Sequence, residues 1–282
     1  METQAELPEF EPSAAGAAVG LVLVLASIGL FPLGRALSLR LFPGRNVIFA
    51  RWGFFHVGLA IFTYFTLTIL GGMALRAAGI GLSGGLVPVV FGAALQVATV
   101  ALCCAFARRL DPDGLASLGL RPGGTPRALG VGVLAYALGM PAIVGAMLLS
   151  AWGWKALGVE APPQEVLKLV LELEGAERWA FVGLAVALIP LCEELFFRGF
   201  LQPLLVQNLG DRGGLFATAF LFAAVHGNLV AFLPIFVLAL LLGMVMLRTQ
   251  RIGAAWLVHG LHNGLTIALV LGSDWARRML DA

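Results

Sequence analysis

The sequence predicts an all-α polytopic membrane protein, a bundle of about eight transmembrane helices. Of its 282 residues, 60% are hydrophobic and only 12% are charged, whereas soluble domains usually carry about 25% charged residues. The hydrophobic residues also gather into runs of about 20, the length at which a helix crosses the hydrocarbon core of a bilayer. The net charge of +2, with no block of basic residues, argues against nucleic acid as a partner.

Eight apolar runs account for the predicted helices. In chain order they are 14–34, 52–75, 83–106, 128–152, 179–200, 214–227, 229–247 and 253–272. The sixth run is short, because only about 12 residues precede His226, and at about 1.5 Å per residue they cannot cross about 30 Å of hydrocarbon. We therefore expect this helix to stop partway through the membrane, inside protein or at a wet cavity.

Two longer connections lie between these runs. Residues 108–127 are rich in Gly, Pro and charged residues, which predicts a loop. Residues 153–178 place apolar side chains between 166 and 173 among acidic residues. That pattern suits a helix lying at the membrane interface.

The basic residues predict the orientation of the bundle. With the eight runs as crossing helices, twelve of the 18 Lys and Arg residues fall on one side and six on the other. Because cytoplasmic loops carry the excess of Lys and Arg, we expect the first side to be cytoplasmic and both termini to lie outside, in the plasma (inner) membrane. No Lys or Arg precedes the first apolar run, so we expect that run to be retained as an anchor.

Three charged residues stand inside the fifth run. Glu193, Glu194 and Arg198 each cost roughly 2.5–3.5 kcal/mol at the centre of a membrane helix, so something must offset this cost. Glu194 and Arg198 are four apart, share a helix face and can pair. Glu193 is turned about 100° away around the helix. It is then left without a full charge partner and is a candidate general base.

Histidines follow this group in the later apolar runs. His259 and Asn263 are four apart, so one helix face presents an imidazole beside an amide. Two such donors are what an oxyanion hole for amide hydrolysis requires. Counted along the helices, His259 lies about 10 Å deep, His226 about 18 Å and Glu193 roughly 10–20 Å. All three can meet in the cytoplasmic half of the membrane, where Glu193 would supply a water-activating acid to a buried hydrolytic site.

These residues form three motifs that resemble a known family. In order they are Glu193-Glu194-x-x-x-Arg198, Phe222-x-x-x-His226 and His259-x-x-x-Asn263. The set resembles the CPBP family, the CAAX proteases and bacteriocin-processing enzymes, which includes the Ras-converting CAAX endopeptidase. The segment LGLRPGG at 118–124 also looks like the loop that often precedes the family's core domain.

The resemblance implies an intramembrane glutamate protease with a bundle of eight helices and no metal or other cofactor. By this likeness, Glu193 with His226 would activate the water, and His259 with Asn263 would stabilise the oxyanion. Glu194 and Arg198, the remaining charged residues of the first motif, would hold the site together.

The resemblance also suggests how the chain is organised and what it acts on. Residues 1–127 would form N-terminal transmembrane helices and cytoplasmic loops, and residues 128–282 the catalytic transmembrane core. The partners implied are membrane lipid and a peptide or protein substrate, either a prenylated CAAX protein or another membrane-associated peptide. With 2 Lys against 16 Arg, and abundant Ala and Gly, the composition is typical of a GC-rich bacterium.

Structural interpretations of the same residues stay open. The Glu193, Glu194 and Arg198 group could be an ion-pair network that fixes helix packing. Asn263 could bind two helices together, because Asn forms hydrogen bonds across helices in lipid. We interpret His56 as a hydrogen-bonded core residue.

Three other functions also stay open. A zinc-dependent intramembrane protease would need three protein ligands and a water, and the candidate ligands are Glu193, His226, His259 and His262. A proton-linked transporter would use the buried acid and histidines as a relay. A non-catalytic membrane regulator or immunity protein would bind another membrane protein without cleaving it.

Overall fold

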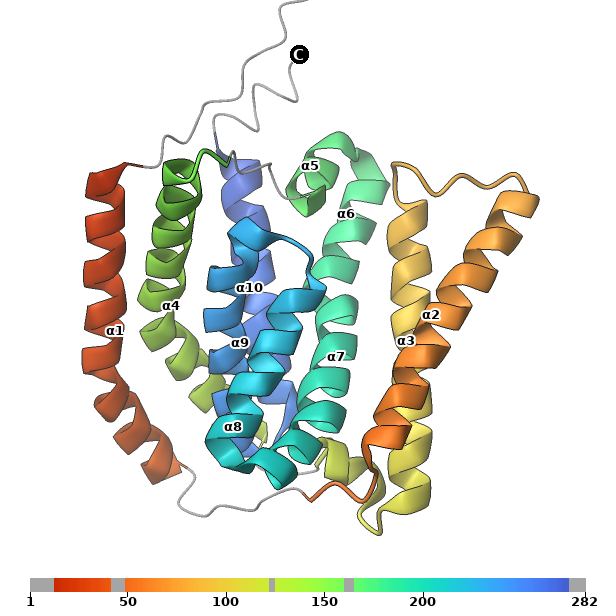
Figure 1. Ribbon diagram of the computed structural model, residues 1–282, viewed down its shortest axis with the longest axis horizontal. Helices are drawn as coiled ribbons and strands as arrows, with labels where there is room; N and C mark the ends of the chain where they lie inside the picture. Colours follow the sequence, from red (N-terminus) through yellow and green to blue (C-terminus); the bar gives the residue numbers. More distant parts are fainter. Residues whose placement is uncertain (1–12, 42–48, 122–124, 160–164, 274–282) are drawn as a thin grey trace, which may run out of the picture.

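The computed structural model describes residues 13–41, 49–121, 125–159 and 165–273. Within these residues the chain forms helices and no strand. The helices stand side by side in a single bundle (Figure 1). Seven helical runs in the described part of the chain are long and apolar enough to cross a membrane, so the predicted all-α, multi-pass class is confirmed.

The helices follow the predicted runs closely. They are α1 (Ala14–Leu41), α2 (Phe54–Ala77), α3 (Val87–Leu110), α4 (Thr125–Ala156), α5 (Glu165–Glu172), α6 (Gly175–Gly183), α7 (Ile189–Glu194), α8 (Gln202–Val225), α9 (Leu229–Thr249) and α10 (Ile252–Gly272). A short 3₁₀ helix, η1 (Gly114–Leu118), follows α3, and two π-helical segments, η2 (Leu184–Leu188) and η3 (Leu195–Leu201), flank α7.

The difference between eight predicted spans and seven apolar runs lies in one long stretch. Residues Gly175–Val225 form a continuous helical run of 51 residues, about 77 Å long and more than twice the thickness of the hydrocarbon. The run breaks at Gly210, whose φ of 71° and ψ of 171° are not helical. Beyond the break, Gly214 packs against the backbone of Val206 with no room for a Cβ. The run is therefore two arms of a hairpin, which correspond to the fifth and sixth predicted spans.

The second arm is short, as expected from the sequence. From residue 211 to the end of α8 it has 15 residues, about 22 Å. The turn between α8 and α9 lies short of the upper ends of α4 and α10 (Figure 1). The start of α1 and the end of α10 lie at the same end of the bundle (Figure 1), in agreement with an even number of crossings.

The connection predicted as a loop at 108–127 is more ordered than expected. It contains η1, and Leu118 is fully buried. The carbonyl of Gly119 accepts a hydrogen bond from the backbone N–H of Ile252 at 3.1 Å, so this segment is attached to the start of α10. The predicted domain boundary at 127/128 falls in the first turn of α4.

The predicted interfacial helix corresponds to α5, which lies at one end of the bundle (Figure 1). Val170 and Leu173 are buried, and they pack in a cluster with Phe181 and Ile267. This contact attaches α5 to α6 and α10. The side chains of Val166 and Leu167, which also belong to the predicted apolar face, lie outside the described residues.

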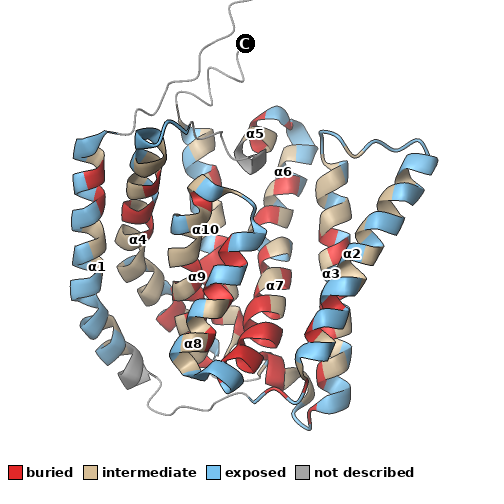
Figure 2. Ribbon diagram, in the orientation of Figure 1, coloured by how far each residue is buried: buried red, intermediate tan, exposed pale blue. Residues whose placement is uncertain are grey.

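Burial is concentrated in the C-terminal helices (Figure 2). In their most apolar stretches, α9 buries 44% of its residues, whereas α1 and α2 each bury 11%. The largest core cluster joins η3, α8 and α9 to α3 and to Trp52, which stacks on Phe200 at 4.8 Å. His56 is hydrogen-bonded as predicted, because its Nδ1 accepts from the Gly53 N–H at 3.2 Å at the start of α2, but it is half-buried and not a core residue.

Candidate active site

The two adjacent glutamates stand on α7, between two π-helical segments. A π-helix is rare and is often found at functional sites. Its wider turn exposes backbone carbonyls of η2 to α10: Trp256 donates to Ala187 O at 2.8 Å, and Asn263 donates to Ala185 O at 2.9 Å. Between them, a Cβ on Gly260 would lie 2.6 Å from Val186 O. Helix α10 is therefore fixed against η2 at close range, which sets the position of its histidines relative to α7.

Glu194 and Arg198 form the ion pair that their spacing predicts. Arg198 Nη1 donates to Glu194 Oε1 at 3.1 Å, and both side chains are fully buried. Arg198 also donates from Nη2 to the carbonyl of Ala239 on α9 at 3.3 Å, and its guanidinium lies 4.2 Å from the centre of the Phe222 ring. The carboxylate, the carbonyl and the aromatic face together offset the cost of burying this cation.

Gln202 continues the same polar stripe, and the sequence reasoning missed it. It lies four residues after Arg198, is 1% exposed, and donates from Nε2 to the carbonyl of Gly243 at 3.1 Å. Arg198 and Gln202 therefore bind two successive turns of α9. The signal in the sequence was the i, i+4, i+8 spacing from Glu194, which places three polar side chains on one face of an otherwise apolar helix.

His259 lies between the two glutamates. Its Nδ1 is 2.9 Å from Glu194 Oε1, and its Nε2 is 3.7 Å from Glu193 Oε2. The glutamates differ in exposure: the Glu194 side chain is 0% exposed, whereas that of Glu193 is 20% exposed. One carboxylate is thus enclosed and paired with a cation, whereas its neighbour is partly exposed.

His226 stands at the end of α8, and the ring of Phe222 contacts both its imidazole and that of His259. Phe222 is fully buried, and its ring centre is 4.8 Å from that of His226 and 5.7 Å from that of His259. His226 Nδ1 is 2.7 Å from Phe222 O. Because a carbonyl only accepts, this contact places the proton on Nδ1 and leaves Nε2 with the lone pair. His226 itself is exposed.

Asn263 is half-buried, and its contact with Ala185 O is the helix-to-helix hydrogen bond that its structural interpretation predicts. A side-chain amide has two N–H donors, so one remains for another acceptor. His262 contacts α4, where its Nδ1 is 3.4 Å from the hydroxyl of Tyr136.

The contact with Tyr136 gives His262 a structural partner, and it separates this residue from the set considered for zinc. Among the described residues, no group of three His, Cys, Asp or Glu side chains could hold a metal ion. Glu193, His226, His259 and His262 therefore do not form a coordination shell in this structure.

The fold and the cluster define a multi-pass helical membrane protein that keeps two carboxylates, an arginine and histidines together between its helices. Residues 175–265 match the family model described as Rce1-like, type II CAAX prenyl endopeptidase. The matched segment runs from α6 into α10 and contains all three motifs. The match confirms the predicted resemblance: this segment, about a third of the chain, is similar to the type II CAAX prenyl endopeptidases. Comparison with curated proteins and with solved structures gave no match.

Proposed function

We propose that this protein hydrolyses a peptide bond of a membrane-associated substrate with a water molecule activated by Glu193. The observation that supports this most strongly is the unequal environment of the two adjacent glutamates. Glu194 is enclosed with Arg198, whereas Glu193 is partly exposed and lies 3.7 Å from His259. Two carboxyl groups in different environments can take different roles, one as a proton acceptor and one as a fixed charge.

In this proposal, Glu193 and His226 act on the water. Glu193 accepts a proton as the water oxygen attacks the peptide carbonyl carbon. His226, whose Nδ1 is occupied by Phe222 O, has its Nε2 available to take or return a proton. The new C–O bond forms first, the C–N bond then breaks, and the proton held on Glu193 passes to the leaving amine. Glu193 ends the cycle in the form in which it began.

His259 and Asn263 would stabilise the oxyanion that forms between these steps. His259 has carboxylates near both ring nitrogens, and in its protonated form both nitrogens donate. Nδ1 then donates to Glu194, and Nε2 is left to donate to a substrate oxygen that enters beside Glu193. Asn263 would contribute its second amide N–H. Each such donor is worth roughly 10²–10³ in rate.

The family description favours a prenylated CAAX peptide as substrate, and other membrane-associated peptides with an extended C-terminal segment fit the same chemistry. From the distribution of basic residues, we propose that the cluster opens to the cytoplasmic half of the plasma membrane and that both termini lie outside.

Peptide cleavage by the purified protein tests this proposal. We would incubate a prenylated CAAX peptide, beside a library of lipidated peptides, with wild type, Glu193→Gln and Glu177→Gln, each with and without EDTA. Glu177 is an exposed carboxylate on α6 and serves as the matched control. We expect cleavage by wild type and Glu177→Gln that survives EDTA and is lost in Glu193→Gln.

Other results would contradict the proposal in different ways. Loss of cleavage with EDTA would indicate the zinc mechanism. Cleavage that persists in Glu193→Gln would remove Glu193 from the chemistry. No cleavage by folded wild type would favour a transporter, tested by proton flux in liposomes, or a regulator.

A further inference from the structure

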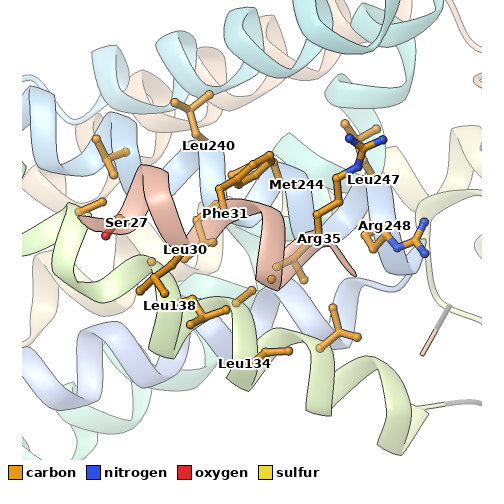
Figure 3. Close-up of a pocket in the computed structure, with 18 of the residues that line it drawn as sticks. Ser27, Leu30, Phe31, Arg35, Leu134, Leu138, Leu240, Met244, Leu247 and Arg248 are labelled. Carbon is orange, nitrogen blue, oxygen red and sulfur yellow. The ribbon is translucent and has the colours of Figure 1, made fainter. Parts of the chain in front are cut away.

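A second site lies on the far side of α9 from the glutamates. Helices α1, α4 and α9 surround a groove of about 760 Å³ (Figure 3). Successive residues of a helix are turned by about 100° around its axis. Leu241 and Arg248, which line the groove, therefore lie about 180–200° around α9 from Ala239, whose carbonyl accepts the hydrogen bond from Arg198. The groove is therefore separated from the candidate active site by the thickness of α9. Its α1 and α4 walls also lie outside the segment that matches the protease family.

The groove has an apolar body and a charged end. Leucine, isoleucine, valine, phenylalanine, methionine and small residues form most of its wall. Arg35 of α1 and Arg248 of α9 lie together at one end, and Ser27 lies toward the other (Figure 3). Asp211 also contributes to the wall, so these three charged side chains carry a formal net charge of +1. The distribution is that of a site for an amphiphile with an anionic head.

The length of the groove fits one leaflet of a membrane. Along α4 the wall runs from Val131 to Ala142, and along α9 from Val237 to Arg248. Each stretch covers 11 residue steps, about 16 Å, which is close to half of the roughly 30 Å of hydrocarbon. An acyl chain that starts at the arginines would therefore end near the middle of the bilayer.

The attachment of α1 keeps this groove open to lipid. Helix α1 touches α4 backbone to backbone near its start, where a Cβ on Gly20 would lie 2.9 Å from Gly145 O. Farther along, Phe31 lines the groove and is 54% exposed. A lipid could thus enter sideways from the membrane without passing the candidate active site.

We propose that this groove binds an anionic phospholipid, with one acyl chain along α1, α4 and α9 and its phosphate at Arg35 and Arg248. Basic pockets between transmembrane helices commonly bind anionic head groups. The charged end complements such a head group, and the apolar body matches one chain in one leaflet.

Native mass spectrometry of the intact protein in detergent tests this site. Phosphatidylglycerol and phosphatidylcholine with identical acyl chains would be titrated separately. We expect wild type to bind phosphatidylglycerol more tightly, and the double variant Arg35→Gln/Arg248→Gln to lose about fivefold affinity per arginine, roughly 25-fold in total. Its affinity for phosphatidylcholine should fall less, because the choline cation of that lipid offsets the charge of its phosphate. The matched control is Arg108→Gln/Arg109→Gln, which removes two exposed arginines from α3 and should keep the preference.

A second variant tests the apolar body without altering charge. Ala142→Phe places a ring in the groove, and we expect it to weaken the binding of both lipids. Equal affinity of wild type for the two lipids, or an equal loss in the α3 control, would overturn the proposal. Displacement of the bound lipid by a prenylated peptide would also overturn it, because the groove would then be a substrate site.

Discussion

The N-terminal helices and the C-terminal core use polar and apolar residues in opposite ways. Helices α1 and α2 bury few of their residues and present apolar side chains such as Val22 and Phe62 to the surrounding lipid. The core around α7, η3 and α9 encloses Glu194, Arg198 and Gln202. In a bilayer the outer surface is as apolar as the interior, so burial is revealed by the polar residues that a helix retains. The positions of the charges therefore identify the functional core better than hydrophobicity does.

Substitution of Arg198 should show the largest difference in stability between the polar core and the exposed surface. Arg198→Met leaves Glu194 buried without its cation, which typically costs about 3–5 kcal/mol. We expect a large loss in the free energy of unfolding and loss of activity, measured by denaturant unfolding in detergent and by peptide cleavage. The exposed Arg212 provides the matched control, and Arg212→Met should change stability by less than about 0.5 kcal/mol. Equal effects of the two substitutions would contradict the account.

Two phenylalanines test the same contrast without charge. Phe222 is fully buried between the guanidinium and the two histidines, whereas Phe62 on α2 is 67% exposed. We expect Phe222→Ala to cost about 3–5 kcal/mol and Phe62→Ala to stay within about 0.5 kcal/mol. Chemical unfolding in the same detergent gives both values. A larger loss for Phe62→Ala would mean that α2 is covered by another protein surface and not by lipid.

Substitution of the two histidines of the third motif should lower catalytic activity to different extents. His259 contacts both glutamates, whereas His262 contacts Tyr136. Loss of an oxyanion donor typically lowers kcat roughly 10²–10³-fold, and we expect this for His259→Ala but less than about tenfold for His262→Ala. Steady-state cleavage kinetics measure both. Comparable losses would indicate that His262 also takes part in the chemistry.

Gln202 should have the smallest of these effects. Gln202→Leu removes the hydrogen bond to Gly243 O while keeping most of the side-chain volume. The Gly243 carbonyl still belongs to the hydrogen-bonded backbone of α9 after the substitution. We therefore expect a loss of only about 0.5–1.5 kcal/mol in unfolding free energy and little change in kcat. A selective loss of kcat would place Gln202 in the catalytic machinery.

The sequence predicts the crossing helices well because a long apolar run has few alternatives in a membrane. It also predicts the Glu194–Arg198 pair, since four residues on a helix set both side chains on one face. The break at Gly210 falls in the predicted gap between the fifth and sixth runs, although the helix continues past the predicted end at residue 200. The two π-helical segments were not predicted. They depend on backbone hydrogen-bond register, which hydrophobicity does not report.

Partners that lie far apart in the sequence were missed for a related reason. Asn263 binds a backbone carbonyl of η2. Every residue has a backbone carbonyl, so the residue types do not show which one will accept this hydrogen bond. The partner of His262 is Tyr136, 126 residues earlier and on another helix. A single sequence cannot place those helices beside each other, so the role of His262 could not be assigned from it.

The most direct test of the central claim compares the two adjacent glutamates. Glu193→Gln and Glu194→Gln each remove one carboxylate, and both kcat and unfolding free energy would be measured for each. We expect Glu193→Gln to lower kcat roughly 10²–10⁴-fold, as loss of a general base does, with stability close to wild type. We expect Glu194→Gln to lower stability by about 3–5 kcal/mol, because Arg198 loses its partner. If both variants were equally destabilised and activity followed the folded fraction, the glutamates would form a structural network without a catalytic base.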